Sequence, residues 1–192
     1  SHLTQSLLGD GWQFLGIDAL TDYYDLAEKE ANLAHFEGHP NFDLVRGDLV
    51  DLPLEQLFSG GPAVFHLAGQ PGVRGSFGFG FDDYVHHNIT ATQRLFEAAR
   101  AVGVPRVVYA SSSSVYGDAD TYPSREAGNR PQPRSPYGVT KHTCEDLAAV
   151  YRGLGLSSVG LRYFTVYGPR QRPDMAIHKF VRATLRGEPI PF

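Results

Sequence analysis

The sequence predicts an α/β fold built on a doubly wound parallel sheet. Five short apolar segments recur along the 192 residues, separated by helical or loop stretches. Several of these segments are apolar throughout rather than alternating, which is typical of strands covered on both faces of a parallel sheet. Strands that alternate with helices imply right-handed crossover connections.

The predicted strands are residues 14–17, 42–45, 63–68, 106–110 and 158–164. The chain opens on Ser1-His2-Leu3 with no initiator Met, and this opening has the pattern of a helix interior. It stops at Phe192, where a further strand could begin. We therefore expect a fragment.

Three further helices are predicted from apolar periodicity and end signals. Residues 82–102 carry one apolar stripe, and Gly103 stops it. Residues 136–152 follow Ser135-Pro136, a typical N-cap with Pro at the first helical position. Residues 174–186 form the last helix and end before Gly187. The stripe of the first of these helices consists of Val85, Ile89, Thr92, Leu95, Phe96, Ala99 and Val102.

Composition excludes several classes of protein. Hydrophobic residues make up 42% and charged residues 20%, which are globular proportions. The net charge is −4 and the basic residues are scattered, so we expect neither nucleic acid nor a membrane surface as partner. Cys144 is the only cysteine, which excludes an internal disulfide and favours a reducing compartment, the cytoplasm. No apolar run approaches the ~20 residues of a spanning helix, and we expect no metal site.

Two polar segments follow predicted strands. Residues 69–81 are rich in glycine, and residues 117–135 carry Pro123, Pro131 and Pro133. Both segments should lie at the carboxyl edge of the sheet, where open α/β folds bind ligands.

Tyr137 and Lys141 form a candidate acid/base pair. Their spacing of four residues puts both side chains on one face of the helix at 136–152. A neighbouring ammonium favours phenolate and so lowers the pKa of a tyrosine, which can then take a proton from a substrate hydroxyl. Such a pair also arises by chance in many helices. The serine-rich run Ser111–Ser114, directly after a predicted strand, strengthens the catalytic interpretation because a hydroxyl there could bind both the substrate oxygen and the tyrosine.

Asp18 is a candidate cofactor ligand at the end of the first predicted strand. In a dinucleotide-binding unit, an acidic residue ~20 positions after the glycine loop binds the adenosine ribose. No Gly-x-Gly-x-x-Gly precedes Asp18 here. An ordinary turn-forming aspartate is the alternative. If Asp18 binds the ribose, NAD is preferred over NADP, since a 2′-phosphate would be repelled.

Several segments in order resemble the extended short-chain dehydrogenase/reductases, and among them the nucleotide-sugar epimerases. These segments cover nearly the whole chain, and Arg170–Met175 with Gly72-Val73-Arg74 is most similar to UDP-glucuronate 4-epimerases. The others are Ser1-His2-Leu3, Gly16-Ile17-Asp18, Arg46-Gly47-Asp48-Leu49, Phe65-His66-Leu67-Ala68-Gly69, Asn88 with Ala91-Thr92, Ser111–Gly117, Ser135–Lys141 and Leu161–Pro169.

The resemblance implies a Rossmann-like fold, NAD as cofactor and a role for each matching residue. Tyr137 would be the acid/base, Lys141 would bind the nicotinamide ribose and tune Tyr137, and Ser112 would be the catalytic hydroxyl. Asn88 would order the edge of the sheet. The implied cofactor-binding residues are Asp18, Asp48, Leu49, Leu67, Ala68, Gly69, Tyr137, Lys141 and Tyr163. The implied substrate contacts are Arg74, Ser112, Ser113, Ser114, Thr165 and Arg172, the last with a surface charge as the alternative.

Ser113 and Ser114 favour one reaction within the family. Related dehydratases carry an Asp-Glu pair at these positions and related decarboxylases a Glu at the second, whereas hydroxyls serve proton abstraction at carbon poorly. They could instead hold a uronate carboxylate. The resemblance therefore implies inversion of C4 of a UDP-sugar, with UDP-glucuronate favoured, through a 4-keto intermediate. The alternatives are a 4,6-dehydratase, a decarboxylase, a reductase or a non-catalytic dinucleotide-binding protein.

The resemblance also implies a division of the chain and a homodimer. Residues 1–164 would be a partial NAD-binding domain without its first strand and glycine-rich loop, and residues 165–192 the start of a substrate-binding region. The homodimer would form through the helices at 82–102 and 136–152. We expect the fragment itself to bind NAD poorly and turn over little.

Overall fold

The computed structural model describes residues 1–118, 122–127 and 131–190. The strand pairings that it contains are parallel, as expected for an α/β fold. The chain forms two compact units. We call residues 1–48 with 165–192 the terminal unit and residues 49–164 the central unit.

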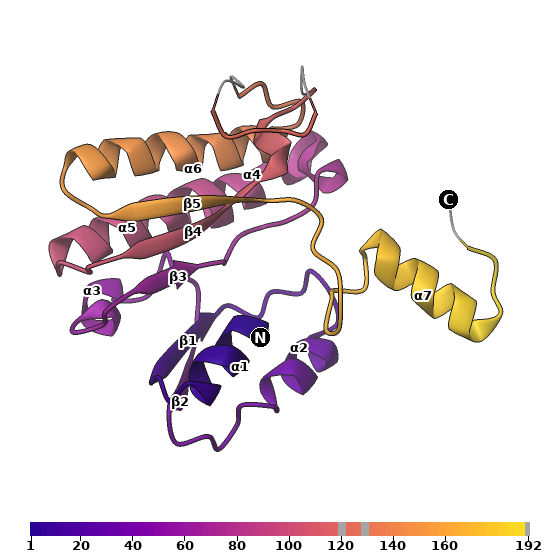
Figure 1. Ribbon diagram of the computed structural model, residues 1–192, viewed down its shortest axis with the longest axis horizontal. Coiled ribbons are helices and arrows are strands. Elements are labelled where there is room, and N and C mark those ends of the chain that lie inside the picture. The colour runs from indigo at the N-terminus through magenta and orange to yellow at the C-terminus, as the bar shows by residue number, and fades with distance from the viewer. Residues whose placement is uncertain (119–121, 128–130, 191–192) are drawn as a thin grey trace. The chain divides into compact units, whose positions relative to one another are not determined.

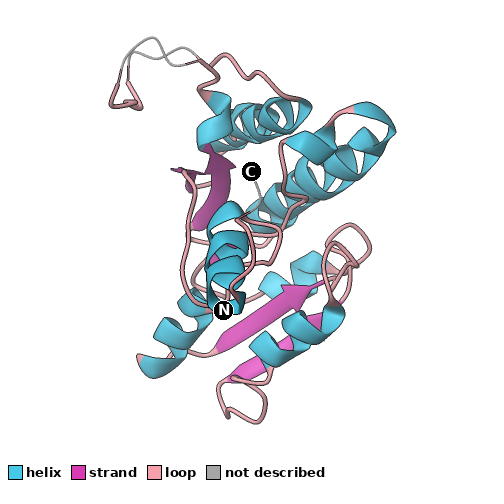
Figure 2. Ribbon diagram, turned by 90° about the vertical axis from the view of Figure 1, so that its right-hand side faces the viewer, coloured by secondary structure: helices cyan, strands magenta, loops and turns pink. Residues whose placement is uncertain are grey.

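The terminal unit is built on a two-stranded sheet. β1 (Phe14–Asp18) pairs with β2 (Phe42–Arg46) from Phe14↔Phe42 to Asp18↔Arg46, and Figure 2 shows the two arrows side by side. The helices of this unit are α1 (His2–Gly9), α2 (Leu26–Leu33) and α7 (Ala176–Arg186). α2 begins at Asp25, whose carboxylate accepts a 2.9 Å hydrogen bond from the Ala27 amide, the typical N-cap contact.

The central unit contains a three-stranded sheet in the order β3-β4-β5 (Figure 1). Its strands are β3 (Val64–His66), β4 (Val107–Ser112) and β5 (Ser158–Tyr163), and Ser112 pairs with Tyr163 at the carboxyl end. Its helices are α3 (Leu54–Phe58), α4 (Phe81–Tyr84), a π-helix at Val85–Thr90, α5 (Ala91–Ala101) and α6 (Pro136–Gly153), with short 3₁₀ turns at Arg74–Ser76, Gly78–Gly80 and Ser113–Val115.

The two crossover helices, α5 and α6, pack on the same face of this sheet. Phe96 of α5 meets Tyr109 of β4 with ring centroids 5.5 Å apart, and both side chains are buried. Successive right-handed crossovers that advance in one direction place their helices on one side of the sheet. The other face is therefore more open, and Phe65, Val159 and Leu161 are 39–41% exposed there. Cover on both faces, which the apolar strands suggested, is absent from the described part of this sheet.

The structure confirms the five predicted strands and the helical opening. β3 is shorter than predicted, because the chain turns away after His66. The predicted helix at 82–102 is divided into α4, the π-helix and α5, although Thr92, Leu95, Phe96 and Ala99 of its stripe are buried as predicted. The helices at 136–152 and 174–186 are present as α6 and α7. α2 and α3 were not predicted.

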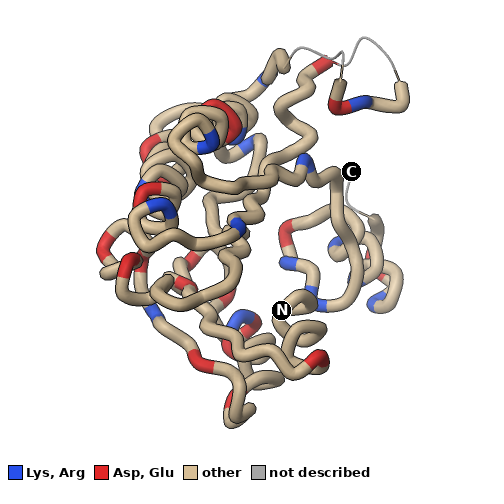
Figure 3. The backbone as a smooth tube through the Cα atoms, turned by 60° about the vertical axis from the view of Figure 1, so that its left-hand side comes forward, with Lys and Arg blue, Asp and Glu red and all other residues tan. Residues whose placement is uncertain are grey.

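Charged side chains are interspersed along the described backbone, with acidic and basic residues close to one another in sequence (Figure 3). Among the described helices, none combines the length and the apolar character that crossing a bilayer requires. One boundary between the two units falls between Phe164 and Thr165 and the other between Asp48 and Leu49. The functional division of the chain at residue 164 stays a prediction.

Candidate active site

Tyr137 and Lys141 lie in the first two turns of α6. The helix begins at Ser135, whose hydroxyl accepts a 3.0 Å hydrogen bond from the Gly138 amide, and Pro136 is its first residue. This start fixes where the two side chains emerge from the helix. Tyr137 is half-buried, and its ring meets that of Tyr84 edge-on with centroids 6.2 Å apart.

Lys141 is buried, with 7% of its surface exposed. Its Nζ donates a 3.1 Å hydrogen bond to the carbonyl oxygen of Ala110 in β4. Burial lowers the pKa of this ammonium, with a smaller opposing contribution from Cys144. An ammonium has three donors, and the protein residues that the structure describes satisfy one of them at Lys141. The remaining donors are available to an oxygen-rich ligand.

Ser112 ends β4, close to the start of α6. Its Oγ accepts a 3.1 Å hydrogen bond from the Ser114 amide, so its own hydrogen stays available for donation. Ser113 and Ser114 form the turn that follows and are half-buried. A Cβ on Gly138 would lie 2.8 Å from the Ser114 carbonyl oxygen, which shows how closely the first turn of α6 packs against this turn.

The chain after β3 passes directly beside Lys141. Leu67 and Ala68 are exposed, and Gly69 adopts a φ of +155°. A Cβ on Gly69 would lie 2.6 Å from Asn88 Oδ1 and 3.3 Å from Lys141 Nζ. Only glycine leaves this space empty, so the backbone here can approach a ligand closely.

Asn88 ties the loop after β3 to α6. Its Oδ1 accepts from the Gln70 amide at 2.8 Å, and its Nδ2 donates to the Gln70 carbonyl at 3.1 Å and to Thr140 Oγ1 at 3.0 Å. The carbonyl oxygen of Asn88, within the π-helix, accepts a 3.3 Å hydrogen bond from the Cys144 thiol. Asn88 is 1% exposed, so these contacts suit the ordering role that the sequence suggested.

His66 is a buried polar residue to which the sequence analysis assigned no role. Its Nε2 lies 2.9 Å from Thr92 Oγ1. Burial, and then the positive charge of Lys141, lower the pKa of His66 to about 3. The imidazole is therefore neutral beside the ammonium. Its position at the end of β3 within an apolar strand was the available signal.

Three further predicted residues belong to the central unit. Arg74 begins a 3₁₀ turn in the glycine-rich segment and is exposed. Tyr163 is 40% exposed and is the register partner of Ser112 at the end of β5. Leu49, in contrast, is buried.

Asp18, Asp48, Thr165 and Arg172 belong to the terminal unit. The Oδ1 of Asp18 accepts a 2.8 Å hydrogen bond from the Leu20 amide, which is the turn-forming contact considered above. The residue is exposed, and this contact uses one of its two carboxylate oxygens. Asp48 is half-buried and Thr165 is exposed.

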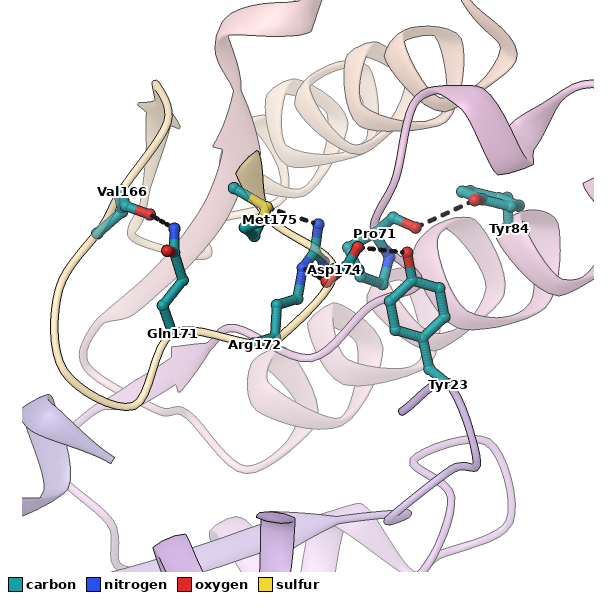
Figure 4. A network of polar contacts seen from close by, with 8 residues as sticks. All are labelled: Tyr23, Pro71, Tyr84, Val166, Gln171, Arg172, Asp174 and Met175. Carbon is teal, nitrogen blue, oxygen red and sulfur yellow. Dashed lines mark hydrogen bonds and ion pairs between the residues drawn. The ribbon is translucent and has the colours of Figure 1, made fainter. Parts of the chain in front are cut away.

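The Arg172 side chain is held by residues of its own unit (Figure 4). Its Nε forms a 2.8 Å ion pair with Asp174, and its guanidinium lies over the ring of Tyr23 at 5.5 Å. Tyr23 donates in turn to Asp174 at 3.1 Å. One terminal nitrogen also contacts the Met175 sulfur at 3.2 Å. The Arg172 side chain thus packs against residues of its own unit, and its contact with substrate stays a prediction.

The residues around Lys141 fit the nicotinamide ribose of NAD. Lys141 has ammonium donors beyond its bond to Ala110, and the vacant Cβ position of Gly69 lies 3.3 Å from Lys141 Nζ. Tyr137 precedes Lys141 by one turn of α6. A ribose offers vicinal hydroxyl oxygens that can accept from such an ammonium. In the central unit, Lys141, Tyr137 and Gly69 would hold this part of the cofactor.

The chain is similar to known nucleotide-sugar enzymes. "Uncharacterized UDP-glucose epimerase YtcB" of Bacillus subtilis (strain 168) is 42% identical over 192 residues, covering 99% of this chain and 60% of that protein. A crystal structure of UDP-glucuronic acid 4-epimerase from Bacillus cereus, in complex with UDP-glucuronic acid and NAD, has a TM-score of 0.93 at 39% identity. The match covers 98% of this chain and 60% of that one.

A dehydratase structure is also similar. A double mutant of DesIV, a dTDP-glucose 4,6-dehydratase from Streptomyces venezuelae with NAD bound, has a TM-score of 0.88 at 31% identity, covering 99% of this chain and 60% of that one. The chain thus spans about 60% of the length of these relatives. The model of the NAD dependent epimerase/dehydratase family matches residues 1–192, and the chain belongs to that family.

Proposed function

We propose that the protein is an NAD-dependent nucleotide-sugar epimerase that inverts C4 of UDP-glucuronate through a 4-keto intermediate. The observation that carries the proposal is the buried ammonium of Lys141, one helical turn after Tyr137 and with donors left for a ligand. The similarity to epimerases, including one solved with UDP-glucuronic acid and NAD, supports it.

The residues of the chain divide the chemistry as follows. Bound NAD supplies the reversible oxidation of the sugar alcohol. The Tyr137 phenolate takes the proton from the sugar 4-hydroxyl and later returns it, since a phenol beside an ammonium ionises more readily. Lys141 holds the nicotinamide ribose and stabilises that phenolate. Ser112 donates its free hydroxyl hydrogen to the sugar oxygen.

Ser113 and Ser114 support a uronate as substrate. Their hydroxyls follow the catalytic strand end directly, where they can donate hydrogen bonds to a carboxylate. Neither can act as a carboxylic acid toward a carbon-bound proton. The similarity to DesIV makes a 4,6-dehydratase the second candidate function, and the two serines rank it below the epimerase. Arg74, Thr165 and Arg172 are the other substrate contacts of this proposal, and a guanidinium can bind a carboxylate or phosphate through parallel hydrogen bonds.

Asp18, Asp48, Leu49, Leu67, Ala68 and Tyr163 complete the proposed NAD site. Asp18 would bind the adenosine ribose with the carboxylate oxygen that does not accept from the Leu20 amide. We also propose a homodimer through α5 and α6. Val139 and Val150 of α6 and Leu154, its C-cap, are 46–60% exposed. Light scattering of the purified protein would give the mass.

The full-length protein that carries this chain tests the proposed reaction. It is incubated with UDP-glucuronate and NAD, and the sugar products are followed by NMR. Accumulation of UDP-galacturonate, without carbon dioxide or net NADH, is the expected result. Conversion of UDP-glucose to UDP-galactose instead would keep the mechanism and overturn the uronate pocket. A 4-keto-6-deoxy product would establish the dehydratase.

A further inference from the structure

Glu145 joins three elements of the central unit. It lies on α6, one turn after Lys141, and its Oε1 accepts hydrogen bonds from Ser111 Oγ at 2.5 Å and from Arg162 Nε at 2.8 Å. Its Oε2 accepts from a terminal nitrogen of Arg162 at 2.7 Å. Ser111 is on β4 and Arg162 on β5, and the two are register partners. One carboxylate therefore connects α6 to both strands.

Both charged side chains are largely buried. The Glu145 side chain is 15% exposed and that of Arg162 19%. Burial by itself raises the pKa of Glu145, but the hydrogen bonds from Arg162 and Ser111 and the charge of Arg162 outweigh it and lower the pKa overall. The guanidinium also lies over the Tyr116 ring at 4.7 Å. The pair is thus charged and closely surrounded.

Stability alone does not account for such a pair. Desolvation of two charges is costly, and apolar residues of similar volume often stabilise a protein as well or better. What the pair adds is geometry. The guanidinium fork donates one hydrogen bond to each carboxylate oxygen, and such two-bond pairing fixes distance and orientation together.

The position of the pair relates it to the candidate site. Tyr137, Lys141 and Glu145 follow one another at intervals of four residues, so they share one face of α6. Ser111 directly precedes Ser112, and Arg162 directly precedes Tyr163. Each group that Glu145 contacts is therefore next in sequence to a proposed site residue.

We propose that the Glu145–Arg162 pair is a positioning device that sets α6 against β4 and β5, so that Tyr137 and Lys141 meet Ser112 in register. The inference rests on the proposed function of that site. Ser111 is the third member, since its hydroxyl links the carboxylate to the strand that carries Ser112.

Three variants of the full-length protein test this inference. Arg162→Met breaks the pair and leaves a buried carboxylate. Glu145→Met/Arg162→Met replaces both charges with apolar side chains of similar volume. Arg162→Lys keeps the charge but loses the fork. The control is Glu30→Gln/Arg46→Gln, which removes a second two-bond pair, in the terminal unit, whose bonds are 2.5 and 2.9 Å.

The expected result separates stability from turnover. The double Met variant unfolds at a temperature closer to wild type than Arg162→Met does, because no buried charge is left unpaired. Its kcat nevertheless falls about 10- to 100-fold, whereas KM changes little, since misplacement of catalytic groups impairs the chemical step. Arg162→Lys recovers part of that loss. The control pair variant keeps the wild-type kcat.

Two results would overturn the inference. One is a double Met variant, folded, with wild-type kcat. The other is a kcat of Arg162→Met that equals the wild-type value at temperatures where the variant is fully folded and falls only at temperatures where it unfolds. If the double variant does not fold, Arg162→Lys decides alone, and a folded Arg162→Lys protein with wild-type kcat contradicts the positioning role.

A spectroscopic measurement separates this inference from the proposed reaction. If the wild-type protein converts no nucleotide sugar, the proposed function fails. The ¹³Cζ resonance of Tyr137, assigned with Tyr137→Phe in ¹³C-tyrosine-labelled protein, still reports its surroundings. We expect the chemical shift of Tyr137 ¹³Cζ to change in the Glu145→Met/Arg162→Met variant and to be unchanged in the Glu30→Gln/Arg46→Gln control. Superimposable Tyr137 resonances in wild type and double variant would contradict the inference whatever the reaction.

Discussion

The Nζ atom of Lys141 donates a 3.1 Å hydrogen bond to the carbonyl oxygen of Ala110, two residues before Ser112. The hydrogen bond fixes the ammonium of Lys141, on α6, against β4, the strand that carries the proposed catalytic hydroxyl of Ser112. Lys141 is therefore held in place by the protein before any ligand binds, with donors remaining for one. The predictions below follow from this arrangement and from the contacts around it.

Substitution of Lys141 should impair catalysis without unfolding the protein. Lys141→Met removes the charge that favours the Tyr137 phenolate but keeps most of the buried volume. We expect turnover to fall by about 100-fold or more and NAD affinity, measured by calorimetry, to weaken. Lys179→Met, an exposed lysine on α7, is the matched control and should match wild type. Undiminished turnover in Lys141→Met would show that the ammonium has no part in the chemistry.

A methyl group at Gly69 should disturb both Asn88 and Lys141. In Gly69→Ala the Cβ would meet Asn88 Oδ1 at 2.6 Å, and the φ of +155° adds strain. We expect lower NAD affinity and a lower unfolding temperature. Gly153→Ala is the control, because nothing lies within 4 Å of its Cβ position near the end of α6. Equal NAD affinity in the two variants would argue against the close approach at Gly69.

Removal of the Asn88 amide should cost stability. Asn88→Ala leaves the half-buried Gln70 amide and carbonyl without their partner. We expect the free energy of unfolding, measured by urea denaturation, to fall by about 2 kcal/mol or more. Asn41→Ala serves for comparison, since Asn41 makes a 3.3 Å side-chain bond to the Gly11 carbonyl and should matter less. A larger loss of unfolding free energy in Asn41→Ala than in Asn88→Ala would contradict the stabilising role of the Asn88 hydrogen bonds.

His66 should make the protein less stable as pH falls. Its pKa is about 3 in the folded protein, whereas an unfolded histidine has a pKa of about 6.5. Between these values the unfolded chain binds a proton that the folded protein does not. Stability is therefore complete above about pH 6.5 and is lost below it, by up to ~1.4 kcal/mol per pH unit.

The variant His66→Gln tests this contribution, because an amide can still bond Thr92 but does not titrate. Its unfolding temperature should fall less steeply than that of wild type between about pH 6.5 and pH 5, where carboxylates remain largely ionised. Parallel curves for the two proteins would mean that His66 is not held neutral by its surroundings.

Local sequence signals predicted the strands and the start of α6. The apolar runs are short and bounded by turn residues, and Ser135-Pro136 combines an N-cap with proline at the first helical position. The sequence also placed Tyr137 and Lys141 on one helix face. α2 was missed although Asp25 is a typical N-cap, because only two of its eight residues are large and apolar and none is buried.

The break within residues 82–102 depends on contacts distant in sequence. In the π-helix at Val85–Thr90, the Asn88 side chain forms hydrogen bonds with Gln70 and Thr140. The Asn88 carbonyl accepts a hydrogen bond from Cys144, 56 residues away. Periodicity within one segment carries no information about such partners. The Glu145–Arg162 pair was missed for the same reason, although a charged residue inside a strand implies a partner.

Tyr137 carries the central claim, and turnover of Tyr137→Phe in the full-length protein tests it most directly. The variant lacks only the hydroxyl that would exchange the proton with the sugar. With UDP-glucuronate and NAD, its rate of C4 inversion should fall by about 1000-fold, while NAD still binds. Tyr122→Phe, which removes the hydroxyl of a tyrosine that is 83% exposed, should keep the wild-type rate. An unchanged rate in Tyr137→Phe would contradict the assignment of this residue as the acid/base.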